Sequence, residues 1–164
     1  MSNKEIVSAE SIKTYYEKDH DRLDEFFKDF QENKSKDFPR AKNSFKEFMF
    51  GLQRHIVWEE NIIFPIFEQK TGMIEHGPTN IMRMEHRQIK QILDSIHEKV
   101  RKQDTASEKE EEMLLSVLTL HNLKEENILY PSIDNVLSDE ERKSVFLKMK
   151  NTPEESYKKC CCDH

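Results

Sequence analysis

The sequence contains little glycine or proline and no long apolar run. Only 3 of its 164 residues are glycine and 5 are proline, which is few for a fold built from sheets and turns. No apolar stretch reaches the roughly 18 residues that cross a bilayer, and the N-terminus lacks the apolar core of a signal peptide. These absences predict a cytoplasmic protein that has no membrane partner.

Cysteine and an excess of positive charge are missing from the body of the chain. Cys160, Cys161 and Cys162 are adjacent near the C-terminus, so they predict no disulfide framework, and they lack the spacing of a zinc site. The net charge is −6 and charges of both signs are mixed, which argues against nucleic acid as the main partner. Charged residues make up 35% of the chain. This length and composition predict one all-α domain.

Apolar residues recur at alternating steps of three and four, as on the buried face of an amphipathic helix. The first predicted helix spans about residues 11–33 and the second begins near Pro39. Pro65 is expected to kink or end this second helix, with Thr71-Gly72 as a terminator. The third helix begins at Gly77-Pro78 and continues to about residue 100. The fourth begins at Ser107 and its inward residues continue to Ile128.

Two capping-box signatures complete the helix pattern. Ser107 with Glu110 opens the fourth helix, and Ser138 with Glu141 opens a short extra C-terminal helix that reaches about residue 150. The short links predict an up-down-up-down four-helix bundle over residues 11–150. Residues 1–10 and the cysteine-containing residues 151–164 are expected to be flexible.

One motif is written twice. His55 is followed by Glu59 and His121 by Glu125, and each pair is trailed by a second glutamate, an asparagine and a proline. The offset of 66 residues also carries His20 onto His86. A histidine and a glutamate four residues apart lie on one face of a helix, so each pair points an imidazole and a carboxylate in one direction.

These polar residues interrupt helix faces that are otherwise apolar. A carboxylate on an inward face costs several kcal/mol unless it is paired or coordinated, so the pattern predicts a buried cation. A buried polar network without metal is the alternative. The predicted metal ligands are His20, His55, Glu59, His86, His121 and Glu125.

Neighbouring polar residues are expected to lie outside this site. Glu60 and Glu126 are one residue round the helix and are interpreted as surface groups or as groups behind the ligands. His76 is expected to be solvated. His97 lies three turns beyond His86, about 16 Å away by the helical rise, and is too far to share the site.

Imidazoles mixed with carboxylates suit iron or manganese, and the absence of thiolate from these helix faces argues against a cysteine-rich zinc site. Two glutamates on opposite helices are well placed to bridge two ions. With an oxo or hydroxo bridge each ion receives five ligands, which leaves one position open on an ion that prefers six. The predicted cofactor is two iron ions, whereas manganese or zinc fits less well. O₂, NO or peroxide would suit such a site.

The order and spacing of these motifs resemble the hemerythrin-like (HHE cation-binding) family over about residues 11–135. The resemblance implies a four-helix bundle that holds a non-haem di-iron centre through the six residues. Oxygen carriers of this family have a further histidine where this chain has Lys90. If Lys90 faces the bundle, Lys90→His is expected to add an imidazole ligand.

The ligand set is most similar to that of the di-iron proteins that repair iron-sulfur clusters. Those proteins usually carry an N-terminal cysteine-bearing domain, which we do not expect ahead of His20. The first functional hypothesis is a centre that binds or reduces NO, O₂ or peroxide, with an electron donor or an iron-sulfur protein as partner.

The second hypothesis is a sensing, storage or carrier module for O₂ or iron, without turnover. The third is a structural bundle with incidental metal. Sequence does not separate the first two hypotheses, because turnover depends on redox potential and electron supply.

Overall fold

The computed structural model describes residues 10–158, and within that range every regular element is helical, which confirms the all-α prediction. The long helices are α2 (Ile12–Asn33), α3 (Phe38–Trp58), α5 (Pro78–Arg101) and α6 (Glu108–Lys124). The shorter elements are η1 (Glu59–Ile63), α4 (Phe64–Thr71), η2 (Glu125–Leu129), α7 (Tyr130–Val136), α8 (Asp139–Lys150) and η3 (Glu154–Ser156).

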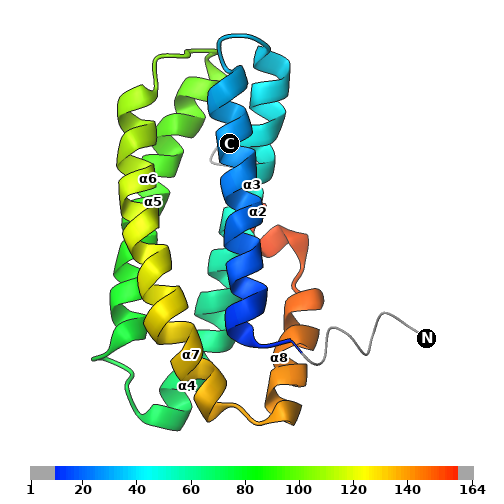
Figure 1. The fold of residues 1–164 in the computed structure, drawn as a ribbon, viewed down its shortest axis with the longest axis vertical. Coiled ribbons are helices and arrows are strands. Elements are labelled where there is room, and N and C mark those ends of the chain that lie inside the picture. The colour runs from blue at the N-terminus through cyan, green and yellow to red at the C-terminus, as the bar shows by residue number, and fades with distance from the viewer. Residues whose placement is uncertain (1–9, 159–164) are drawn as a thin grey trace, which may run out of the picture.

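The long helices lie side by side along the long axis of the molecule, and α4, α7 and α8 lie at one end (Figure 1). Two separate clusters of buried apolar side chains hold them together. On α2, Tyr16 belongs to one cluster and Leu23 to the other, and His20 lies between them. Along α3 and α5 a histidine likewise lies between residues of the two clusters. A polar layer therefore divides the core in two.

Most of the predicted helix ends are present. Ser11 caps α2 by accepting a hydrogen bond from the backbone N–H of Thr14 over 3.0 Å. Gly72 ends α4 with a φ of 75°, a left-handed conformation that favours glycine. At the start of α8, Ser138 and Glu141 form both hydrogen bonds of a capping box.

The capping box predicted at Ser107 is wrong, although Ser107 does precede α6. Its hydroxyl donates to Oε2 of Glu111 over 2.5 Å instead of capping the backbone. Glu110 pairs with Lys99 at 3.0 Å. The carboxylate of Glu111 is buried and also binds Lys34 at 2.5 Å. A buried carboxylate needs every available donor, and this need outweighs the local capping pattern.

The second and fourth helices each contain a π-helical segment that the sequence pattern did not reveal. In η1 the N–H of Phe64 reaches back five residues to the carbonyl of Glu59, and in η2 the N–H of Tyr130 does the same to Glu125. Pro65 follows η1 and does not end the helix, which continues as α4. Within η1, the carbonyl of Glu60 accepts a hydrogen bond from the side chain of Arg83 at 3.3 Å.

The wider turn of η2 also changes which residues near its C-terminal end face inward. Ile128, which was expected to face inward, is 59% exposed, whereas Leu129 is 1% exposed. The expectation for Ile128 assumed α-helical spacing throughout. A π turn adds about one residue to the turn, so the buried position moves one residue along the chain.

The last elements of the described residues are α8 and the short turn η3. Residues 1–9 and 159–164 lie outside the described residues, and with them most of the segments predicted to be flexible, including Cys160, Cys161 and Cys162. Across residues 10–158, none of the helices combines enough length with enough apolar character to cross a membrane.

Candidate metal centre

The six predicted ligands meet in the polar layer between the two apolar clusters. They come from α2, α3, η1, α5, α6 and η2, and each is at most 4% exposed. In chain order they are His20, His55, Glu59, His86, His121 and Glu125.

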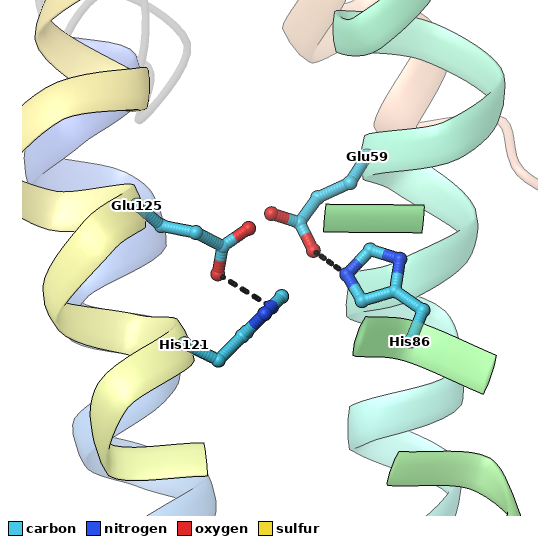
Figure 2. Close-up of side chains that lie close together, drawn as sticks. All are labelled: Glu59, His86, His121 and Glu125. Carbon is cyan, nitrogen blue, oxygen red and sulfur yellow. Dashed lines mark ion pairs between the residues drawn. The ribbon is translucent and has the colours of Figure 1, made fainter. Parts of the chain in front are cut away.

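Their ligand atoms form two overlapping groups. Glu59, His86, His121 and Glu125 make one group, and His20, His55 and Glu125 make the other. Figure 2 shows the first group, in which Glu59 pairs with His86 and Glu125 with His121, each across 3.2 Å. Glu125 also lies 3.4 Å from Nε2 of His20, so its Oε1 atom faces both groups.

Each of the four histidines has a carboxylate at Nδ1. Asp19 lies 2.9 Å from His55, and Glu85 lies 2.9 Å from His121. Glu60 lies 2.8 Å from His86, and Glu126 lies 3.0 Å from His20. A carboxylate at Nδ1 holds a proton there and directs Nε2 into the cavity. All four imidazoles are therefore oriented as the ligands of a shared metal site would be.

The four carboxylate contacts join the helices in a closed ring. Asp19 links α2 to α3, Glu60 links η1 to α5, Glu85 links α5 to α6, and Glu126 links η2 back to α2. Reasoning from the sequence had placed Glu60 and Glu126 outside the ligands, which agrees with these positions.

Asp19 and Glu85 were missed, although a signal for them exists. Each immediately precedes a repeated histidine, and the 66-residue offset carries one acidic residue onto the other. The offset therefore repeats the groups behind the ligands as well as the ligands.

The buried charges shift the pKa values of this layer strongly. Burial opposes the charged form of Asp19, but the hydrogen bonds and charges of His55 and Arg22 together outweigh it and lower the pKa of Asp19 to about 2. Burial likewise opposes the charged form of His20, yet Glu125 and Glu126 raise its pKa to about 9.

Glu59 and Glu125 lie in the same buried layer and compete for ionisation. Burial and the charge of Glu125 raise the pKa of Glu59 well above its usual range. Burial also opposes ionisation of Glu125, but His121 and other neighbours lower its pKa well below the usual range. Two carboxylates in this position call for positive charge between them.

Several polar atoms of the layer have no hydrogen-bond partner, although Glu59 lies within ion-pair distance of His86 and Glu125 within ion-pair distance of His121. They are Oε1 of Glu59, Nε2 of His86 and both carboxylate oxygens of Glu125. A buried polar atom without a partner is costly, and coordination of a cation would satisfy all of these atoms together. The donor set therefore fits a metal cation.

The two halves of the site have different aromatic residues at equivalent positions. Tyr130 directs its hydroxyl toward the histidines, 3.1 Å from Nε2 of His55, and donates to Oε2 of Glu59 over 2.9 Å. The repeat places Phe64 at the corresponding position, where its ring stacks on His86 at 5.9 Å. The sequence motif alone indicates no role for this tyrosine.

The space between the ligands is small. A cavity of about 10 Å³ lies among them, which is room for about one water molecule, and Leu52 and Leu118 contribute apolar walls. A larger pocket of about 320 Å³ lies between α3 and α5 and shares Ile56, His86 and Ile89 with the cavity. A small molecule could approach the site from that side.

The remaining candidate residues lie outside the site. His76 is exposed, as expected. His97 is buried against Phe45 with ring centroids 6.1 Å apart. The Lys90 side chain is 62% exposed and pairs with Asp94 at 3.3 Å, so the condition that Lys90 faces the bundle is not met. Lys90→His would therefore not place an imidazole among the ligands.

Comparisons with known proteins place this arrangement in context. The family model described as "Hemerythrin HHE cation binding domain" matches residues 12–133. The chain is also similar to a protein of Edwardsiella ictaluri (strain 93-146) named "Iron-sulfur cluster repair protein YtfE", with 44% identity over 45 residues. That match covers 27% of this chain and 20% of the relative. No solved structure gives a significant match.

Proposed function

We propose, from the premise that this chain belongs to the hemerythrin HHE cation-binding domain family, that it is a di-iron protein whose centre binds or reduces NO, O₂ or peroxide. The observation that carries this proposal is the position of Glu125, which faces both groups of buried ligand atoms. A carboxylate shared between two groups is suited to bridge two ions. The same proposal includes the up-down-up-down four-helix arrangement.

The ligands would divide between the two ions. His86 and His121 would hold one ion, and His20 and His55 would hold the other. Glu125 would bridge them, and Glu59, 3.6 Å from Nε2 of His55, is near enough to both groups to do the same.

The donor chemistry favours iron. Imidazole nitrogen and carboxylate oxygen suit iron and manganese, and no thiolate occurs among the described ligands. A structural zinc site has four protein ligands and no open coordination position, and zinc supplies no redox chemistry. Zinc therefore fits this set of imidazoles and carboxylates less well. Iron would supply an exchangeable position and a change of oxidation state.

The protein residues would limit what reaches the ions. The cavity of about 10 Å³ admits molecules of the size of water, NO or O₂. Apolar walls that include Leu52, Ile56 and Leu118 keep bulk water away, and the carboxylates at Nδ1 hold the imidazoles in place. The pocket between α3 and α5 is the proposed route of entry.

Repair of damaged iron-sulfur centres extends this proposal. Its support is the similarity to the repair protein of Edwardsiella ictaluri, which the chain matches over a fifth of that protein's length. An iron-sulfur protein and an electron donor would then be the partners. The alternative is a sensing, storage or carrier module for O₂ or iron without turnover.

Metal content and an optical spectrum of protein purified without chelator would test the metal centre. We expect two irons per chain and a higher melting temperature than that of the metal-free protein, because an ion that binds only the folded state adds its binding free energy to folding. Glu59→Ala combined with Glu125→Ala should reduce iron below two per chain. Glu112→Ala, at an exposed position, should leave the metal content unchanged.

Two irons per chain in the double variant would contradict the bridging role. Equal melting temperatures with and without metal would favour the structural hypothesis instead. Rapid mixing of the reduced protein with NO and with O₂ then distinguishes a reactive centre, which is oxidised irreversibly, from a carrier, which releases O₂ unchanged.

A further inference from the structure

The hydroxyl of Tyr130 lies inside the metal-binding layer. Tyr130 is fully buried, and its oxygen is 3.1 Å from Nε2 of His55 and 3.4 Å from Nε2 of His20. It is also 2.9 Å from Oε2 of Glu59. Three ligand atoms therefore surround this one oxygen.

These separations are those of neighbouring ligands on one ion. Nitrogen and oxygen ligands bind transition metals at about 2.0–2.2 Å, so two ligands at right angles are about 3 Å apart. The Nδ1 atoms of His20 and His55 are already taken by Glu126 and Asp19, so both Nε2 atoms and the tyrosine oxygen face the same point.

The internal repeat places a phenylalanine in one half of the site where the other half has Tyr130. The rings of Phe64 and His86 lie 5.9 Å apart, and so do the rings of Tyr130 and His20. Both aromatic rings are fully buried at the start of the helix that follows a π segment. The two halves therefore place an aromatic ring in the same position, and one carries an oxygen that the other lacks.

The two groups of ligand atoms are also unequal. The group around His86 and His121 has four contributing residues, whereas the group around His20 and His55 has three. The hydroxyl of Tyr130 lies beside the group with three. With Glu59 counted only in the group around His86 and His121, adding this oxygen would give each group four contributing residues.

We propose that Tyr130 is itself a ligand, through its phenolate oxygen, of the ion held by His20 and His55. This inference rests on the proposed di-iron centre. As the ion binds, the O–H bond of the phenol breaks, the oxygen binds the metal, and the proton leaves to solvent without any transfer of electrons. The two ions are then chemically different, because one has an anionic phenolate and the other has none.

The difference has a functional consequence. An anionic oxygen ligand favours the ferric state, so the ion at His20 and His55 is the harder of the two to reduce. It also has one exchangeable position fewer than it would have without the phenolate. The ion at His86 and His121 lies beside the larger pocket through His86 and is the one that receives a small ligand.

The test uses the full chain loaded with iron and oxidised, with the iron content measured for every variant. Wild-type protein should show a phenolate-to-iron charge-transfer band in the visible region, and resonance Raman excitation in that band should enhance tyrosine ring vibrations. Tyr130→Phe should abolish the band while retaining iron. Tyr16→Phe is the matched control, since Tyr16 packs 4.9 Å from the ring of His55 but directs its hydroxyl to Met149 at 3.5 Å.

A variant with the two aromatic residues exchanged tests whether loss of the band in Tyr130→Phe is caused only by a packing defect. Phe64→Tyr combined with Tyr130→Phe should restore a band, now on the other ion. Two irons in the wild type without tyrosine vibrations, or a band that persists in Tyr130→Phe, would overturn the assignment of Tyr130 and leave the di-iron centre standing. Absence of bound iron would remove the proposed function and this inference together.

Discussion

Asp19 on α2 holds the imidazole of His55 on α3, with Oδ2 2.9 Å from Nδ1. Asp19 is only 8% exposed and is held in turn by Arg22, which donates to its Oδ1 over 2.9 Å. The contact fixes the tautomer of His55 and directs its Nε2 atom toward the other ligands. An acidic residue that touches no ion can in this way decide how well an ion is bound.

Removal of this carboxylate should weaken metal binding without removing a ligand. Asp19→Ala is expected to lower iron affinity by about 10–100-fold, the range typical for groups that orient metal-bound histidines. Competition with a chelator of known affinity would measure the change. Asp19→Asn keeps an acceptor for the Nδ1 proton and should recover part of the loss.

Asp21→Ala provides the control for that experiment, because Asp21 is exposed on the same helix. Its affinity for iron should equal that of the wild type. An equal loss of affinity in both variants would point to a general charge effect and would contradict the orienting role of Asp19.

The sequence predicted much of the fold because the helix faces are regular. Steps of three and four along α2 and α5 correctly identified buried residues such as Leu23, Ile89 and Leu93. Glycine and serine signals located Gly72 and Ser138 at helix ends. These signals depend on a few neighbouring residues, so the local sequence was sufficient to find them.

The parts that could not be predicted depend on contacts across the bundle. Ser107 donates a hydrogen bond to the buried carboxylate of Glu111, which also accepts one from Lys34. Lys34 is distant in the sequence, so no local pattern predicts this arrangement. The π segments begin at Glu59 and Glu125, two residues of the ligand layer, and no local pattern marked them. The repeat identified the six candidate ligands. The position of the Tyr130 hydroxyl depends on how the helices pack, so the sequence did not predict it.

The register set by η2 can be tested with two adjacent residues. Leu129→Ala should destabilise the protein by about 2–5 kcal/mol, because a buried leucine leaves a cavity. Ile128→Ala, at a position 59% exposed, should change stability by no more than about 0.5 kcal/mol. Urea unfolding of both variants measures the difference. A helix with uninterrupted α-helical spacing would give the opposite ranking.

Stability of the metal-free protein should fall as the pH rises from neutral. The pKa of His20 is about 9 in the folded protein, compared with 6.5 for an ordinary histidine. The folded state therefore keeps a proton that the unfolded state has already released between these values. This contribution is complete below pH 6.5 and is lost as the pH rises through 9, and it amounts to on the order of 3 kcal/mol.

Urea unfolding at a series of pH values, with chelator present throughout, would measure this dependence. His20→Gln should flatten the fall in stability, whatever its effect on stability at neutral pH. His76→Gln changes an exposed histidine and should leave the slope as it is in the wild type. An unchanged slope in His20→Gln would show that other groups hold the proton.

Lys90→His should leave the metal centre unchanged. Lys90 stands where oxygen carriers of this family place a further histidine, but here its side chain is 62% exposed and turned toward Asp94. Ile89, the preceding residue, is fully buried and lines the ligand cavity. An imidazole at position 89 would enter the cavity, whereas one at position 90 would remain in solvent.

We therefore expect wild-type iron content, optical spectrum and lifetime of any O₂ adduct for Lys90→His, and altered spectra for Ile89→His. A Lys90→His protein that binds O₂ reversibly, when the wild type does not, would show that position 90 can turn inward.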